Sequence, residues 1–347
     1  GNVRAGEHRA AVMTRPTVVG IDIGGTKISL CAADESGEVV AAHRIATRSD
    51  EGAAVVVDRL ADAAEQLMLH VRADGARVCG VGVVTPGVVA SEGVLLAPNN
   101  VGWDTLPLAP TVRERLGIET VEADNDAKAA TAAEARWGAL AGIDDALLVN
   151  LGTGISAGAV VGGRLLRGAH GAALEIAYQV PSDGPLRGFR DDRAPLEETF
   201  SGSGLQATAT ALLQRATATR DIFAAMSSAP TGPTDSPLPN GDLARLAALG
   251  RHALDVAVRA IANLAVALDP EVVAVSGGML RSADQIMPRL AEALERLVPF
   301  PPRLVPAHFA EHAPLAGACL LGYRAAGLDE PPTFTTSRLG GVSHAEQ

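Results

Sequence analysis

The chain has 347 residues, of which 47% are hydrophobic, 20% charged and 3% aromatic. This composition excludes a disordered chain and predicts one large two-lobed unit or two domains, with Ala, Val and Leu filling a core of helices packed on parallel sheets. The net charge of −11 argues against the basic surface that nucleic-acid binding requires.

The three cysteines, Cys31, Cys79 and Cys319, lie far apart in the sequence. Their spacing fits neither a metal site nor a disulfide framework, so we predict free, buried thiols. No apolar stretch reaches the roughly 18 residues of a membrane span, and the N-terminus lacks the apolar centre of a signal peptide. We therefore expect a cytoplasmic protein with no membrane partner and no nucleic-acid partner.

The first half of the chain predicts the order β-β-β-α-β. Residues 1–16 are polar and unpatterned and are expected to form a disordered tail. Strands are predicted over 18–23, 28–33, 39–46 and 78–84, with a helix over 53–71 before the last of them. A Pro/Gly/Asn-rich loop over 85–107, a helix over 111–116, a strand over 120–122 and a helix over 126–137 follow.

The second half repeats the pattern of strand, glycine-rich turn and strand. Strands are predicted over 146–151, 156–161, 164–166, 271–275 and 303–306, and helices over 200–224, 243–268, 283–297 and 314–326. Residues 227–240 read as a surface loop. We predict an N-terminal lobe over 17–125, a C-terminal lobe over 126–328 and a disordered tail over 329–347.

Three predicted strands each end in a glycine-containing turn. The turns are Asp22-Ile23-Gly24-Gly25-Thr26-Lys27, then Gly152-Thr153-Gly154 after Leu151, and Ser276-Gly277-Gly278 after Val275. Glycines allow backbone N–H groups to approach and wrap a phosphate. The need for a tight turn with positive φ explains any one of these on structural grounds, but it explains all three together less well.

Two familiar nucleotide motifs do not match. Residues 20–27 lack the Gly-Lys-Ser/Thr order of a P-loop and continue as a strand instead of a helix. In residues 152–158 the third glycine falls one position late for a dinucleotide fold, and another strand follows. A Rossmann dehydrogenase is therefore not favoured.

Asn125 and Asp126 stand between a short predicted strand and a predicted helix. Asp126 could cap the helix N-terminus, or it could be a general base that accepts a hydroxyl proton while the oxygen attacks a γ-phosphorus. Asp124 offers a second carboxylate next to it, and composition does not decide between the two.

These segments resemble the ROK family of sugar kinases and related repressors, from about residue 17 to residue 326. Residues 22–27 look like the first phosphate loop of the family, Leu151–Ile155 like the second, and Ser276–Gly278 like its adenosine-side turn. Pro86-Gly87 and Ala97-Pro98-Asn99 resemble its sugar-side loops.

Asn125-Asp126-Ala127 looks like the catalytic segment of this family, which selects Asp126 as the general base. The resemblance implies the actin-like ATPase (ribonuclease H-like) fold, two lobes with mixed sheets flanked by helices, and ATP-dependent phosphorylation of a hydroxyl of a hexose or hexose-like substrate. The implied ATP and phosphate contacts are Asp22, Gly24, Gly25, Thr26, Lys27, Gly152, Thr153, Gly154, Gly277 and Gly278, with Mg²⁺ held through ATP near Asp22. The implied substrate contacts are Gly87, Asn99, Asn125, Asp126, Glu175, Tyr178 and Glu197. A homodimer is expected by the same analogy.

The chain departs from the family at its zinc cluster. Family members carry Gly-Glu-Ile-Gly-His and then Cys-x-Cys-Gly-x-x-Gly-Cys, whereas this chain reads Leu174-Glu175-Ile176-Ala177-Tyr178 and has no cysteine in 188–197. No zinc site is expected there, because structural zinc needs closely spaced Cys or His ligands. Glu175 and Glu197, which match the sugar-binding glutamates, remain.

The altered segment leaves two substrate hypotheses open. A remodelled pocket favours an amino sugar or a C7 cyclitol over glucose. The alternative is a glucose kinase that lost zinc, in which Arg190 or Arg193 pairs with Asp191 or Asp192 to hold the loop.

Other residues receive structural interpretations. His170 reads as a polar loop residue and Trp103 as a packing residue; Lys27 and Lys128 could meet phosphates, although solvated lysines are commoner. Two functions other than a kinase stay open: a non-catalytic sugar-sensing ROK protein without a DNA-binding domain, and a structural or chaperone ATPase of the actin-like superfamily.

Overall fold

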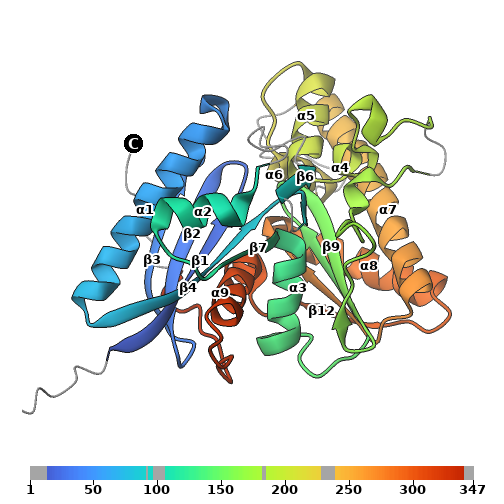
Figure 1. Cartoon of the computed structure of the whole chain (residues 1–347). Helices are drawn as coiled ribbons and strands as arrows, with labels where there is room; N and C mark the ends of the chain where they lie inside the picture. Colours follow the sequence, from blue (N-terminus) through green and yellow to red (C-terminus); the bar gives the residue numbers. More distant parts are fainter. Residues whose placement is uncertain (1–13, 91–92, 97–105, 182–184, 228–238, 340–347) are drawn as a thin grey trace, which may run out of the picture.

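The computed structural model describes residues 14–90, 93–96, 106–181, 185–227 and 239–339. The predicted sugar-side residue Asn99 and the predicted packing residue Trp103 lie outside this part of the chain. Each of two lobes is built on a five-stranded sheet, and helices lie between the sheets and on their outer faces (Figure 1). This arrangement confirms the predicted α/β class with two mixed sheets.

The first sheet has the strand order β3-β2-β1-β4-β7. Its strands are β1 (Arg15–Ile23), β2 (Lys27–Asp34), β3 (Val39–Ala46), β4 (Ala76–Thr85) and β7 (Val121–Asn125). β1, β2 and β3 pair antiparallel, whereas β1, β4 and β7 run parallel. The outer helices α1 (Ala53–Ala73) and α2 (Leu108–Leu116) bury apolar side chains in the same core, and a hairpin of β5 (Val88–Ala90) and β6 (Gly93–Leu96) follows β4.

The second sheet repeats this topology in the order β10-β9-β8-β11-β12. Its strands are β8 (Ala146–Leu151), β9 (Ile155–Val161), β10 (Arg164–Leu165), β11 (Val272–Ser276) and β12 (Arg303–Pro306). β8, β9 and β10 pair antiparallel, and β8, β11 and β12 run parallel, as in the first sheet. The predicted internal repeat is therefore confirmed.

One hydrophobic core joins the second sheet to the helices on its outer face. These helices are α4 (Pro195–Thr199), α5 (Gly202–Leu213), α6 (Thr219–Ser227), α7 (Asn240–Leu268) and α8 (Ala283–Leu297). Short 3-10 helices in the described part are Ser49–Glu51, Ile176–Tyr178, Phe189–Asp191, Gly278–Ser282 and Ala310–His312.

Two helices, α3 (Asp126–Trp137) and α9 (Ala313–Ala325), lie between the sheets (Figure 1). α9 packs on β1 and β4 of the first sheet and on α3, and α3 packs in turn on β9 of the second sheet. A Cβ at Gly82 would collide with the backbone of α9, and one at Gly20 would lie 2.6 Å from Cys319 Sγ. The close contact therefore needs these glycines. The division of the chain at residue 125 stays a prediction.

Three predictions about elements need correction. The helix predicted over 200–224 is broken: Ser201 is extended and caps α5, and Gln214 ends α5 with a φ of 54°. β1 begins at Arg15, within the stretch predicted as a tail. Residues 329–339 are not a free tail, because Phe334 is buried and stacks on Trp137 with ring centroids 5.0 Å apart.

Candidate active site

The junction of β7 and α3 places Asn125 and Asp126 between the two sheets. Asn125 is the N-cap of α3: its Oδ1 accepts the Lys128 N–H at 3.0 Å, and its Nδ2 donates to the Gly87 carbonyl at 2.6 Å. The hypothesis that Asp126 caps the helix is wrong, because Asn125 already occupies that position. Asp126 is thereby left as the first residue of the helix.

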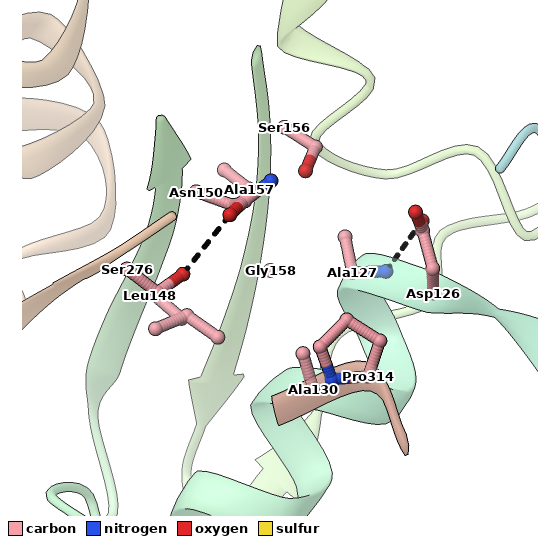
Figure 2. Close-up of a pocket in the computed structure, with 10 residues that line it drawn as sticks. All are labelled: Asp126, Ala127, Ala130, Leu148, Asn150, Ser156, Ala157, Gly158, Ser276 and Pro314. Atoms are coloured by element: carbon pink, nitrogen blue, oxygen red, sulfur yellow. Dashed lines mark hydrogen bonds between the residues drawn. The ribbon is translucent and has the colours of Figure 1, made fainter. Parts of the chain in front are cut away.

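The carboxylate of Asp126 points into a small cavity beside the second sheet (Figure 2). Its Oδ1 accepts the Ala127 N–H at 2.7 Å. Burial, with a smaller contribution from the charge of Glu175, raises the pKa of Asp126 to about 6, while the Ala127 N–H and Lys128 oppose the rise. A carboxylate with such a pKa is ionised at neutral pH and basic enough to accept a proton.

The neighbouring Asp124 is not available for the same role. Both of its oxygens accept from the Arg167 guanidinium, at 3.0 and 2.7 Å, and Oδ1 also accepts the Asn125 N–H at 2.8 Å. Asp124 is only 4% exposed. The structure thus separates the two carboxylates that the sequence left equivalent: Asp124 is a structural ion-pair partner and Asp126 faces the cavity.

The first glycine turn connects β1 to β2 next to this site. The Gly24 N–H donates to the Lys27 carbonyl at 2.9 Å, and the Thr47 hydroxyl donates to the Gly24 carbonyl at 2.6 Å, which leaves Gly25 and Thr26 exposed at the tip. Burial and the charge of Asp126 raise the pKa of Asp22 to about 7, against the effects of Lys27 and Arg44. Asp22 and Asp126 therefore belong to one electrostatic site.

The second and third turns meet at the ends of β8 and β11. The carbonyls of Gly152 and Thr153 accept the N–H groups of Gly202 and Ser203, at 2.8 and 3.0 Å, at the start of α5. Gly277 has a φ of 101°, and a Cβ there would lie 2.7 Å from Asn150 Oδ1. Gly277 must be a glycine because its φ is positive and because its backbone passes close to Asn150. The two glycine turns of the second lobe are thus adjacent.

Sequence reasoning missed two polar residues that line the cavity with Asp126. Asn150 on β8 accepts from the Ser276 hydroxyl at 3.3 Å, and Ser156 on β9 lies on the neighbouring strand (Figure 2). The cavity measures roughly 20 Å³, enough for one water molecule. The polar Asn150 within the otherwise apolar 146–151 strand was the signal that could have revealed this site.

The predicted substrate side gathers Glu175, Tyr178 and Glu197. Glu175 precedes the 3-10 helix that carries Tyr178, and Glu197 Oε2 on α4 accepts the Ile155 N–H at 3.2 Å. Burial raises the pKa of Glu175, and the charge of Glu197 adds to it. Burial, with the charges of Glu175 and Glu197, also raises the pKa of the Tyr178 phenol, so Tyr178 keeps its O–H.

Leu174, which stands where the family has glycine, keeps a left-handed backbone with a φ of 64°. This conformation strains a branched residue. Its partly buried side chain packs against the core of the second lobe. The left-handed turn that precedes Glu175 is therefore formed by a leucine, at a cost in backbone strain.

The segment that replaces the zinc cluster is held by other contacts. The guanidinium of Arg193 pairs with Glu198, Asp191 Oδ2 accepts the Gly188 N–H at 2.9 Å, and Tyr178 meets Phe189 edge-on with centroids 5.4 Å apart. The pairing of Arg190 or Arg193 with Asp191 or Asp192, part of the alternative in which a glucose kinase lost its zinc, is not found: among the described residues Arg193 pairs with Glu198 instead. Within the described residues, no group of three His, Cys, Asp or Glu side chains could hold a metal ion.

The two lysines differ in their surroundings. Lys27 is 47% exposed and lies 3.8 Å from Glu311. Lys128 is only 1% exposed, so its interpretation as a solvated lysine is wrong. Its Nζ lies 3.6 Å from Glu175 Oε1.

His170 is exposed, in agreement with a polar loop residue.

A sequence model of the ROK family matches residues 18–324. The chain belongs to the ROK family. Among ROK proteins, the N-acetylmannosamine kinase of Citrobacter koseri is 30% identical over 311 residues, which cover 88% of this chain and 98% of that protein. The xylose repressor of Caldicellulosiruptor bescii is 28% identical over 164 residues, covering 47% of this chain and 41% of the repressor.

Solved ROK structures share the fold. A ROK family glucokinase from Streptomyces griseus, in complex with glucose and AMPPNP, superposes with a TM-score of 0.68 at 28% identity, covering 89% of this chain and 99% of that chain. The predicted family and the actin-like, two-lobed ROK fold are confirmed. Among the helices in the described residues, none is both long and apolar enough to cross a membrane.

Proposed function

We propose that this ROK protein is an ATP-dependent kinase that transfers a phosphoryl group to a hydroxyl of a hexose or hexose-like molecule. The observation that carries the proposal is the position of Asp126. Its carboxylate lies beside the ends of both sheets, while the adjacent Asp124 is bound by Arg167. Relatives named glucokinase and N-acetylmannosamine kinase support the same reaction class.

Asp126 accepts the proton of the attacking hydroxyl. The turns at 24–27 and 152–154 and the Gly277-Gly278 turn bind the phosphates and the adenosine side of ATP through backbone N–H groups. The carboxylate of Asp22, beside the exposed turn at Gly25 and Thr26, is an oxygen ligand of the kind that Mg²⁺ prefers. Asp22 would hold Mg²⁺ that arrives with ATP, and the ion would supply positive charge beside the transferred phosphoryl group.

The acceptor side consists of Asn125, Glu175, Tyr178 and Glu197, with Gly87 behind Asn125. Carboxylates that accept hydrogen bonds suit a substrate with many hydroxyl donors. We propose glucose, an amino sugar or a C7 cyclitol as candidates, and the phenol of Tyr178 as the group that distinguishes them. Asn99, a homodimer and a cytoplasmic location stay predictions.

A non-catalytic sugar sensor is the second candidate. It is favoured by the exchange of the family histidine for Tyr178 and by similarity to a xylose repressor. A sensor would bind sugars without consuming ATP. Only a kinase would consume ATP and sugar in equal amounts.

The test is ADP release from Mg·ATP with glucose, mannose, N-acetylmannosamine, amino hexoses and C7 cyclitols, each compared with a sample that lacks sugar. We expect one sugar class to raise ADP release by at least about 100-fold and to yield one equivalent of phosphosugar. Continuing ADP release at the same rate with and without sugar would indicate a chaperone-type ATPase. Sugar binding by calorimetry without ADP release would indicate the sensor.

A further inference from the structure

Lys128 is the one described lysine whose ammonium is buried, and the chain has only two lysines among its 29 basic residues. Its Nζ has no hydrogen-bond partner among the described residues. A buried ammonium that makes no hydrogen bond of normal length lowers stability, so apolar residues usually take such positions. The position of this lysine therefore calls for a functional explanation.

The surroundings of Lys128 point to the acceptor side of the site. Nζ lies 3.6 Å from Glu175 Oε1, which is longer than the 2.7–2.9 Å of a charge-assisted hydrogen bond. The backbone N–H of Lys128 is bound by the Asn125 cap, which fixes the first turn of α3. The same turn thus presents Asp126 towards the cavity and Lys128 towards Glu175.

We propose that Lys128 is a positioning residue that holds Glu175 as a charged acceptor for substrate hydroxyls, so that Asp126 and not Glu175 accepts the proton. This inference rests on the proposed kinase function. Its physical basis is that two neighbouring carboxylates compete for one proton unless a cation favours the ionised form of both.

The charges around Asp126 agree with this role. Lys128 lowers the pKa values of both Asp126 and Glu175, against burial. The titratable and charged groups that face this site come from several elements: Asp22 and Lys27 on β1 and β2, Arg44 on β3, Lys128 on α3, Glu175 and Tyr178 on the 3-10 segment, and Glu197 on α4. Lys27 and Arg44 act on Asp22, which leaves Lys128 as the cation that acts on the Asp126 and Glu175 pair.

The kinetic test is Lys128→Met, which keeps the length of the side chain and removes its charge. We expect KM for the sugar to rise about tenfold, KM for ATP to change less than about twofold, and the acid limb of the kcat/KM profile to move to higher pH by roughly one unit. Arg296→Met, which removes an exposed charge on α8, is the control and leaves the profile in place. An unchanged sugar KM and acid limb in Lys128→Met would overturn the proposal.

A second measurement does not depend on turnover. Labelling with ¹³C-lysine gives two Cε signals, which Lys128→Met assigns, and titration with glucose or N-acetylmannosamine should shift the Lys128 signal. If either sugar binds by calorimetry but leaves that signal unmoved, the positioning role is wrong even for an active kinase. If the signal shifts but no sugar is phosphorylated, the kinase proposal fails and the role of Lys128 in binding stands. If no sugar binds, both are wrong.

Folding of the variants provides a further check. Glu175→Gln leaves the buried ammonium without its carboxylate, so we expect a larger loss of thermal stability than in Lys128→Met, and a double variant more stable than Glu175→Gln alone. If the two single variants lose equal thermal stability, and the double variant loses the sum of the two, the side chains of Lys128 and Glu175 do not interact.

Discussion

Asp22 and Asp126 lie close enough at the junction of the two lobes that the charge of Asp126 adds to burial and raises the pKa of Asp22 to about 7. Both carboxylates stand at the ends of strands of the first sheet: Asp22 is the next-to-last residue of β1, and Asp126 directly follows β7 and begins α3, the helix that packs on β9 of the second sheet. ATP bound between the glycine turns would lie next to both. The parallel strands β1 and β7 thus bring the two carboxylates to the same edge of the first sheet, where they form one electrostatic site.

The pKa of Asp126 sets the acid limit of activity. Because burial and Glu175 raise it to about 6, the carboxyl is protonated below that pH and cannot accept a hydroxyl proton. We predict that kcat/KM falls tenfold per pH unit below about pH 6. The measurement is a pH profile with sugar and Mg·ATP at fixed ionic strength. An acid limb of the kcat/KM profile near the ordinary aspartate pKa of about 4 would contradict the assignment of this limb to Asp126.

Asp22 should lower the stability of the fold at neutral pH. Its pKa rises from 3.8 in the unfolded chain to about 7 in the folded one, so folding takes up a proton between these values. The stabilisation is fully present below pH 3.8 and is lost as the pH rises through 7. We therefore predict that Asp22→Asn melts higher than the parent at pH 8, by roughly 2 °C or more, while phosphotransfer weakens.

The control for this prediction is Asp62→Asn, because Asp62 is exposed on α1. Its melting midpoint should follow that of the parent at pH 5 and at pH 8. A midpoint of Asp22→Asn that is below the parent at pH 8 would show that Asp22 forms stabilising contacts in its ionised state.

Gly82 fixes the distance between β4 and α9. A Cβ at this position would collide with the backbone at Ala318 and Gly322. We predict that Gly82→Ala lowers the free energy of unfolding by about 2 kcal/mol or more, because the helix must move away from the sheet. Urea unfolding of the parent and the variant measures this loss of free energy.

Gly241 on α7 is the matched position, since a Cβ there meets nothing within 4 Å. Gly241→Ala should raise the free energy of unfolding by about 0.5 kcal/mol through helix propensity. If both alanine variants behave alike, close packing of α9 on β4 is not the reason for Gly82.

Leu174 tests the left-handed turn before Glu175. Both Leu174→Ala and Leu174→Gly remove its apolar contact, but only glycine adopts a φ of 64° without strain. We predict that the glycine variant is more stable than the alanine variant by about 1 kcal/mol. At an ordinary backbone position the order is the reverse, so a more stable alanine variant would contradict the turn.

Local patterns predicted much of the fold and the place of Asp126 in it. The three glycine turns, the junction of strand and helix at Asn125-Asp126 and the repeat of the sheet all follow from short stretches of sequence. The order Asn125-Asp126 did not show which residue caps α3, because both side chains are good caps. Only the bond from the Lys128 N–H to Asn125 separates the two roles.

Features that depend on distant contacts were not predictable. Arg167 lies 43 residues from Asp124, so nothing near Asp124 indicated that its carboxylate is occupied. Lys128 belongs to an alanine-rich helix, where a lysine ordinarily points to solvent, and nothing near it in the sequence indicated that it is buried 3.6 Å from Glu175. The burial of Phe334 similarly depends on Trp137, on a helix far earlier in the chain.

The most direct test of the central claim compares Asp126→Asn with the parent protein in a single turnover. Calorimetry first establishes that the variant still binds the best sugar of the panel and Mg·ATP, and circular dichroism that it is folded. The account predicts phosphosugar formation at least about 100-fold slower in the variant, because no group accepts the hydroxyl proton. Turnover at the parental rate in a folded, sugar-binding Asp126→Asn protein would contradict the role of Asp126 as the base.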